Sequence, residues 1–276
     1  MSYVFRAGMR YRMPTHFGPA LGPRQGLEGQ RYECRYDPQQ VIVRAAFAVP
    51  AAQLAQFLPP RFEAREPSLV YVTFCYITQA QWLAGRGYNT FGISIPATYR
   101  GRTETVAGEL LLVLWENMAD PIITGREELG FSKVYCELPE PQFVEDDVVC
   151  RASWDGCQFA TLRLSGLQEV AAQALPTPAP SEGLLHYKYI PKTGAPGVAD
   201  AEYPVLTPPT GSHLAIERAM TAQGAACRFR HSSWEELPTL VNIVNTLSEL
   251  SWGECVEATL LRTRGAKDLS DQRILD

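Results

Sequence analysis

The chain has 276 residues, of which 46% are hydrophobic and 20% are charged. This length and composition favour one large globular domain and exclude a disordered chain. The formal net charge is −5 at pH 7 and the arginines are scattered along the sequence, which argues against nucleic acid as a partner. No apolar run approaches the roughly 18 residues of a membrane span, and residues 1–14 lack a signal-peptide core, so we expect a cytoplasmic protein with no membrane partner.

The first half of the chain is predicted to consist mainly of β-strands. Residues 39–49 are rich in β-branched side chains and indicate a strand, which is followed by a short helix over 51–58. Residues 69–77 and 91–95 indicate further strands, separated by a glycine-containing turn. Residues 108–116, GELLLVLWE, form a short apolar run that predicts a strand buried on both faces.

The second half continues this pattern with one sustained helix over residues 235–250. A proline-rich segment over 174–182 is typical of a surface linker. Further strands are predicted over 131–138, 147–154, 159–164, 184–189, 226–230 and 256–262, the first of them preceded by a helical turn over 125–130. Together these elements predict a single α+β, mostly β domain over residues 1–264 with few helices, followed by a loose polar tail over 265–276.

Cysteine and histidine are placed without a metal-binding pattern. The seven cysteines include no C-x-x-C pair, and the four histidines include no H-E-x-x-H motif. We therefore expect reduced cysteines in the core, and neither a metal nor an organic cofactor.

Lysine is rare in this chain, which has 21 arginines and four lysines, and Lys133 is the only lysine before position 188. Unlike arginine, a desolvated lysine can lose its proton and attack a carbonyl carbon to form an imine. If residues 131–135 form a strand, Phe131 and Tyr135 share one face with Lys133. Burial there would lower the pKa of Lys133. The alternative is a lysine on a solvated face, where most lysines lie.

The segment 120–141, DPIITGREELGFSKVYCELPEP, resembles the acetoacetate decarboxylase family at Gly125, Arg126, Glu127, Phe131 and Lys133. A looser similarity extends over most of the chain, including residues 47–64 and 87–97. The resemblance implies a barrel-type sheet that encloses an apolar cavity, with Lys133 as the Schiff-base lysine and a small keto compound as substrate. It also implies a homo-oligomer.

The sequence departs from the family at several positions that the resemblance places near the pocket. Ser132 stands where the family usually has proline, and Val134 replaces the second of its two lysines. An ungapped placement puts the family's pocket arginine at Gln40 and its two pocket glutamates at Thr73 and Thr90. Neutral side chains there predict poor decarboxylation of acetoacetate. The same superfamily includes aldolase-like or dehydratase-like members that act on pyruvate-type keto acids.

Four charged residues complete the predicted site. Glu127 is the second candidate catalytic residue and Arg126 a candidate for substrate binding, although the two can equally pair with each other at a surface turn. Arg24 and His16 lie in a Gly/Pro-rich N-terminal segment, and such segments often carry function. The guanidinium of Arg24 has the fork geometry that suits a carboxylate.

The sequence therefore predicts a lyase that forms a Schiff base on Lys133 and acts on a keto acid by decarboxylation, aldol or dehydration chemistry. Phe131 is expected to form part of the pocket wall, and Trp115 to lie either in the core or at the pocket wall. The alternative is a non-catalytic protein that binds a small molecule in the same cavity, with Lys133 only capping the ligand. A hydrolase that uses Ser94 is the weakest interpretation, because Pro96 replaces the final glycine of the nucleophile-elbow motif.

Overall fold

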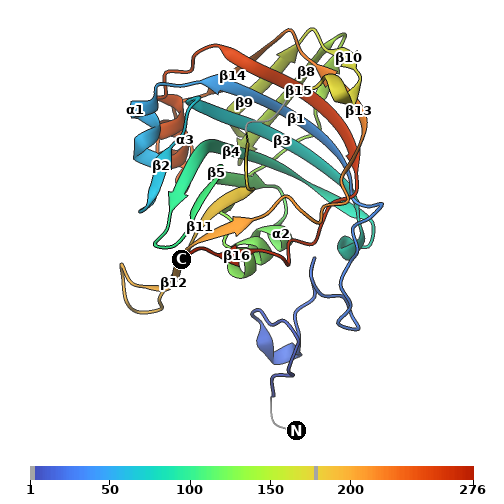
Figure 1. The fold of residues 1–276 in the computed structure, drawn as a ribbon, viewed down its shortest axis with the longest axis vertical. Helices are drawn as coiled ribbons and strands as arrows, with labels where there is room; N and C mark the ends of the chain where they lie inside the picture. The colour runs from blue at the N-terminus through green and yellow to red at the C-terminus, as the bar shows by residue number, and fades with distance from the viewer. Residues whose placement is uncertain (1–3, 177–179) are drawn as a thin grey trace.

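The structure, a computed structural model, describes residues 4–176 and 180–276. A large, strongly curved mixed sheet dominates it, and a smaller antiparallel sheet lies against one face of the large one (Figure 1). The strands are β1 Gln39–Ala48, β2 Phe62–Ala64, β3 Leu69–Ala80, β4 Arg86–Arg100, β5 Thr105–Glu116, β6 Lys133–Tyr135, β7 Gln142–Val144, β8 Asp147–Trp154, β9 Cys157–Ser165, β10 Gln168–Val170, β11 Leu184–Pro191, β12 Ala199–Thr207, β13 Ala215–Thr221, β14 Gly224–Phe229, β15 Cys255–Arg264 and β16 Arg273–Ile274. The α-helices are α1 Ala51–Leu54, α2 Ala119–Thr124 and α3 Val241–Ser248, and a π-helical turn, η4 Gly125–Leu129, follows α2.

The large sheet has 12 strands, with the order β10-β13-β15-β1-β3-β4-β5-β11-β12-β16 and with β2 and β6 paired to β4 and β5. The small sheet has the order β14-β9-β8-β7. Most neighbours are antiparallel, but β5 pairs in parallel with both β6 and β11. The predicted mostly β fold with few helices is confirmed.

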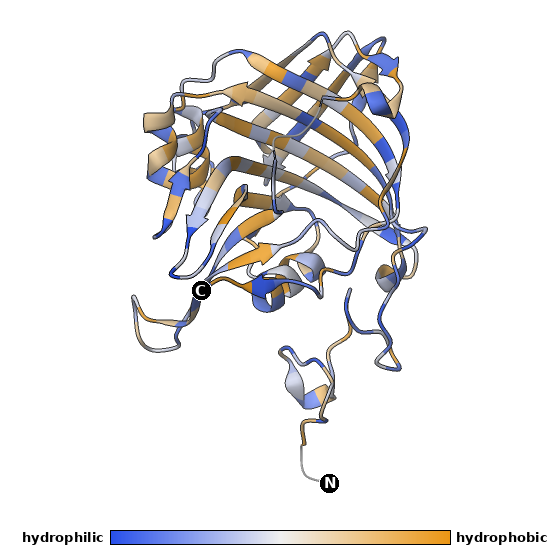
Figure 2. Cartoon of the chain, in the orientation of Figure 1, coloured by the Kyte–Doolittle hydropathy of each residue, from blue (hydrophilic) through white to orange (hydrophobic). Residues whose placement is uncertain are grey.

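The core lies between the two sheets. Alternate residues of β1, β3, β4 and β5 point to the small sheet, which is why these strands alternate in hydropathy along their length (Figure 2). Phe74, Phe91 and Trp115 form a stack, with ring centroids 4.2 Å apart for the first pair and 4.8 Å for the second. Trp115 is fully buried in this core. It therefore does not form part of the pocket wall, contrary to one of the two predicted positions.

The opposite face of the large sheet carries polar side chains, and register places them in one row. Cys75 on β3 is paired with Thr90 on β4, and Thr90 is paired with Glu116 on β5. Directly paired residues of antiparallel strands point to the same face. The chain then leaves β5 and forms α2 and η4, which lie beside this polar face below the sheet (Figure 1). This arrangement places Glu116 at the end of β5 and next to α2.

Several elements differ from their predicted extents. Helix α3 begins only at Val241, because Pro238 has no backbone N–H and disfavours a helical residue before it. Strand β4 begins earlier than predicted, at Arg86, because residues of the predicted turn pair with β3 and so belong to the strand. Strand β6 has only three residues, and β5 is its partner. Of the predicted linker over 174–182, residues 177–179 lie outside the described residues.

The segment 265–276 is not the loose tail that we expected. Its strand β16 pairs with β12, and Leu275 is buried in the core. Asp268 accepts two hydrogen bonds from the guanidinium of Arg31 at 2.7 and 2.8 Å. These contacts hold the end of the chain against the large sheet. No helix in residues 4–176 and 180–276 is long and apolar enough to cross a membrane.

Candidate active site

The amine of Lys133 lies beside a buried carboxylate. The chain that leaves β5 after Glu116 passes through α2 and η4 and returns as β6, whose first residue, Lys133, is paired with Leu114 of β5. This loop brings Nζ of Lys133 to 2.8 Å from Oε1 of Glu116. Nζ also donates a hydrogen bond of 3.0 Å to the carbonyl oxygen of Pro121 at the start of α2.

Gly125 leaves the space that this side chain needs. A Cβ atom at position 125 would lie 2.5 Å from Cε and 2.7 Å from Nζ of Lys133. Both distances are far below van der Waals contact, so any larger residue would push the amine away from Glu116. The glycine of the Gly-Arg-Glu motif is therefore required by the close approach of Lys133 to η4.

Burial moves the pKa values of the two partners toward each other. The side chain of Lys133 is 10% exposed and that of Glu116 is 1% exposed. Burial lowers the pKa of Lys133, and the charge of Glu116 and its hydrogen bond oppose this shift. Burial also raises the pKa of Glu116, while Lys133 opposes that shift. Burial therefore lowers the cost of passing a proton from the Lys133 ammonium to the Glu116 carboxylate, the transfer that leaves a free amine next to a carboxylic acid.

The surroundings of Lys133 differ from the prediction in one respect. Nζ lies 5.3 Å from the centroid of the Phe131 ring, as expected, but Tyr135 points outward and is 49% exposed. The predicted lowering of the pKa is confirmed in direction, with burial as its largest cause. The buried neighbour that we missed is Glu116. Its position in the apolar run GELLLVLWE was a signal, because a carboxylate in a buried strand needs a partner.

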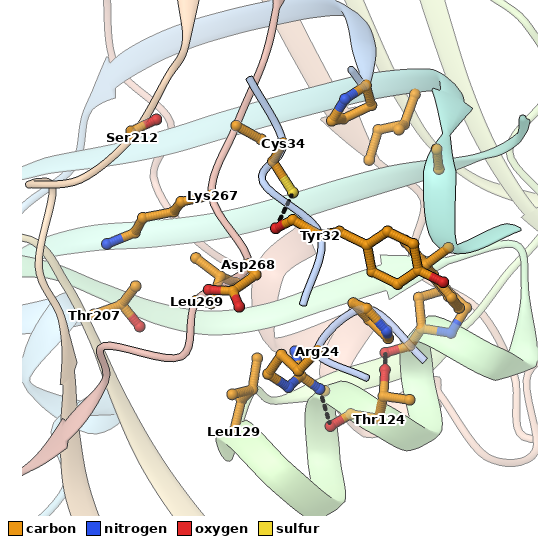
Figure 3. A pocket seen from close by; sticks show the side chains of 18 of the residues that line it. Arg24, Tyr32, Cys34, Thr124, Leu129, Thr207, Ser212, Lys267, Asp268 and Leu269 are labelled. Atoms are coloured by element: carbon orange, nitrogen blue, oxygen red, sulfur yellow. Dashed lines mark hydrogen bonds between the residues drawn. The ribbon is translucent and has the colours of Figure 1, made fainter. Parts of the chain in front are cut away.

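Lys133 lines a cavity of about 740 Å³ with mainly apolar walls. The cavity is formed by the N-terminal segment, the end of β3, α2 with η4, and residues 266–269 near the C-terminus (Figure 3). Gln40 and Arg24, two of the predicted substrate-binding residues, also line it. Apolar side chains that line it include those of Ile77, Trp82, Leu129, Leu184, Leu214 and Leu269.

Arg24 is buried and belongs to a cluster with excess positive charge. Its Nε donates a hydrogen bond of 2.7 Å to Oε2 of Glu128 on η4, and Nη2 donates a long one of 3.4 Å to the carbonyl oxygen of Thr124 (Figure 3). Glu128 also pairs with Arg12, and Arg10 lies 3.8 Å away. Three guanidinium groups thus share one carboxylate. The charge of Arg24 also lowers the pKa of Lys133.

Lys133 and Arg24 lie close together because they bind carbonyl oxygens of the same helix, those of Pro121 and Thr124. Lys133 donates to the first and Arg24 to the second, and the two residues are one turn apart on α2. One helical turn corresponds to about 5.4 Å along the axis. The amine and the guanidinium therefore lie at neighbouring positions along one wall of the cavity.

The other predicted site residues lie outside the cavity lining. Glu127 and Arg126 are exposed on η4, and Arg126 donates a hydrogen bond of 2.7 Å to the carbonyl oxygen of Lys133. A catalytic role for the Glu127 side chain is therefore not compatible with its position, because a π-helical turn directs it to solvent. His16 is exposed on a 3₁₀ turn of the N-terminal segment. Thr73 accepts a hydrogen bond from Arg44, which pairs with Glu109 elsewhere on the sheet.

Thr90 has an intermediate position. It is the direct neighbour of Glu116 in the register of β4 and β5, although it does not line the cavity. The ungapped placement put a glutamate of the family at this position. In this chain a carboxylate comes instead from Glu116, the residue that is paired with Thr90 on the adjacent strand β5.

The fold and the site define a β-rich protein in which a lysine that lines an apolar cavity contacts a buried carboxylate. The acetoacetate decarboxylase family model matches residues 12–266, and the chain therefore belongs to this family. No curated protein sequence matches the chain.

Solved structures show the same fold at low sequence identity. A structure of an acetoacetate decarboxylase is 14% identical, with a TM-score of 0.69 and coverage of 99% of this chain and 98% of the other. The acetoacetate decarboxylase from Legionella pneumophila is 17% identical, with a TM-score of 0.62 and coverage of 92% and 94%. The enduracididine biosynthesis enzyme MppR, complexed with pyruvate, is 13% identical, with a TM-score of 0.62 and coverage of 87% and 89%.

Proposed function

We propose that this protein is a lyase in which Lys133 forms a Schiff base with a keto acid. The observation that carries the proposal is the buried contact of 2.8 Å between Nζ of Lys133 and Glu116 at the cavity wall. Membership of the acetoacetate decarboxylase family and the fold shared with MppR, which binds pyruvate in its crystal structure, support it. The proposed site consists of Lys133, Glu116, Arg24 and Gln40.

In the proposed reaction, Glu116 acts as the general acid and base. It takes the ammonium proton of Lys133, and the free amine adds to the ketone carbon to give a carbinolamine. The carboxylic acid of Glu116 then protonates the carbinolamine hydroxyl, which leaves as water, and this step yields an iminium ion and a carboxylate. Arg24 holds the carboxylate of the keto acid, because its cluster has more positive than negative charge.

Two further steps are open to the iminium ion. A carboxylate in the β position can leave as carbon dioxide, and the electron pair of its C–C bond forms an enamine. Alternatively, the Glu116 carboxylate removes a proton from the α carbon, and the enamine attacks an aldehyde whose oxygen takes that proton back. After decarboxylation the enamine carbon takes a proton from water, which restores the iminium ion. In both cases hydrolysis of the imine then releases Lys133. The proposed cytoplasmic location and homo-oligomeric state remain predictions, as does the single domain over residues 1–264.

Borohydride should trap a covalent adduct on Lys133 when the protein is incubated with keto acids. Reduction of the imine fixes the substrate carbon skeleton on Nζ, which intact mass measures and peptide mapping assigns to Lys133. The panel should include pyruvate, acetoacetate and larger aryl keto acids. Lys133→Arg, which keeps the positive charge but cannot form an imine, is the control. An equally strong adduct in that variant, or no adduct with any member of the panel, would favour the non-catalytic binding protein instead.

Acetoacetate itself is expected to be a poor substrate. Gln40, at which the ungapped placement puts the family's pocket arginine, lines the cavity, and a cavity of about 740 Å³ is far larger than a four-carbon acid needs. Each charge-assisted contact that is absent costs roughly 1.5–3 kcal/mol, or one to two decades in rate when it acts in the transition state. The steady-state rate of carbon dioxide release from acetoacetate measures this loss of activity. Turnover near the enzyme median of about 10 s⁻¹ would show a plain decarboxylase.

A further inference from the structure

A chain of three polar side chains, two of them buried, reaches the cavity. His186 on β11 is fully buried, and its Nε2 lies 2.8 Å from the hydroxyl oxygen of Thr207 at the end of β12. Nε2 of Gln272, in the C-terminal segment, donates a hydrogen bond of 2.5 Å to the same oxygen. Thr207 is one of the residues that line the cavity (Figure 3). Neither His186 nor Gln272 does so, and the Schiff-base reaction uses none of the three.

The hydrogen-bond pattern determines which way the Thr207 hydroxyl proton points. Burial lowers the pKa of His186 to about 3, so the ring is neutral and carries one N–H. Nδ1 of His186 has no partner among the described residues. A buried N–H without a partner is rarer than a buried acceptor without one, so the proton belongs on Nε2, which donates to Thr207.

Both lone pairs of the Thr207 oxygen are then occupied. His186 donates to one and Gln272 donates to the other, and a hydroxyl has only two acceptor positions and one proton. The proton is therefore free to be donated, and Thr207 lines the cavity. Two donors that polarise the same oxygen also strengthen the hydrogen bond that it donates.

The wall between Lys133 and Thr207 is apolar. Nζ of Lys133 lies 5.3 Å from the Phe131 centroid, and the Phe131 and His186 centroids lie 4.1 Å apart. The cavity side of this stretch is lined by Leu129, Leu184 and Leu269, which pack in the same small cluster as Phe131. A ligand that reaches from the amine to the hydroxyl must therefore place an apolar group between its two polar ends.

We infer that Thr207 forms a distal subsite and donates a hydrogen bond to an acceptor at the far end of an aryl keto acid whose ketone meets Lys133. This inference rests on the proposed function, because Lys133 fixes the keto end of the ligand. It assigns to Thr207 a positioning role, with His186 and Gln272 orienting its hydroxyl group.

The test compares 4-hydroxyphenylpyruvate with 4-methylphenylpyruvate, which have almost the same shape but differ in the acceptor at the ring's far end. Isothermal titration calorimetry of the whole chain measures both affinities without requiring a Schiff base. The wild-type protein should bind the hydroxyl compound about 2- to 12-fold more tightly, the range that a single net hydrogen bond gives. Thr207→Val, which keeps the shape of the side chain, should abolish this preference, and Thr207→Ser should retain it.

The outcomes separate this inference from the proposed function. Equal affinities in the wild-type protein, an unchanged preference in Thr207→Val, or no binding of either compound would overturn the distal subsite. Borohydride trapping of the same two compounds reports separately on Lys133. A preference that Thr207→Val abolishes, with no trapped adduct in any variant, would support the subsite and contradict the Schiff-base enzyme.

Discussion

Replacing Glu116 by glutamine is expected to slow imine formation on Lys133 by about 10²- to 10⁴-fold, the usual contribution of a general acid or base. Glutamine has nearly the same size and can still accept a hydrogen bond from Nζ, but it can neither take the ammonium proton nor protonate the leaving hydroxyl. The measurement is the rate of adduct formation under single-turnover borohydride trapping with an aryl keto acid. Substrate affinity should change much less than this rate, because Glu116 does not line the cavity.

The pH dependence of the same variant distinguishes proton transfer from simple activation of the amine. Glu116 raises the pKa of Lys133, so its replacement leaves burial and the Arg24 charge unopposed and lowers that pKa further. The midpoint for chemical modification of the Lys133 amine should therefore move to lower pH in Glu116→Gln. The variant would then have more free amine at neutral pH and still react more slowly.

Glu109→Gln is a matched control for this experiment. Glu109 is also on β5 and also pairs with a cation, Arg44, at 2.7 Å, but it does not line the Lys133 cavity. Its replacement should leave both the trapping rate and the midpoint at Lys133 unchanged. Trapping rates of Glu116→Gln within about threefold of wild type, far short of the roughly 10²-fold low end of the expected range, would contradict the acid–base role.

Breaking the buried pair should destabilise the fold strongly, whereas replacing both partners should not. Removal of one member of a buried ion pair costs up to about 3–5 kcal/mol, but an apolar replacement of both is often neutral or stabilising. We therefore expect large losses of unfolding free energy in Glu116→Leu and in Lys133→Met, and a stability near wild type in the double variant. Urea unfolding of the wild-type protein, the two single variants and the double variant measures these free energies of unfolding. Additive losses in the double variant would show that the two residues are not coupled.

The loss in Lys133→Met should depend on pH in a defined direction. Without Lys133, burial alone raises the pKa of Glu116, so the folded state binds a proton that the unfolded state releases above its ordinary pKa of about 4.3. Stability then falls as pH rises through this range. The variant should accordingly lie closer to wild type at pH 4 than at pH 7. The opposite trend would indicate that Glu116 is solvated or has another partner.

The amino-acid sequence determined the elements that depend on local patterns. Alternation and β-branched side chains identified most strands of both sheets, although their ends moved where a partner strand extended the pairing, as at Arg86. The strands that these patterns did not identify are β2, β7, β10, β12, β13 and β16. The scarcity of lysine and the Gly125–Lys133 motif led to Lys133, a buried lysine that lines the cavity. These features are encoded within a few residues of one another, so a single chain segment is enough to recognise them.

The tertiary structure alone decided which groups surround that lysine. Glu116 and Lys133 are 17 positions apart and meet because β6 pairs in parallel with β5 after the α2–η4 turn. Arg24 lies at the same cavity wall and is held there by its hydrogen bond to Glu128. The C-terminal segment, predicted as a loose tail, lines part of the cavity, and its Gln272 donates a hydrogen bond to Thr207. Periodicity gives the face of each strand but not its register against another strand. The partners of a buried charge depend on that register, and it is fixed only when the whole core packs.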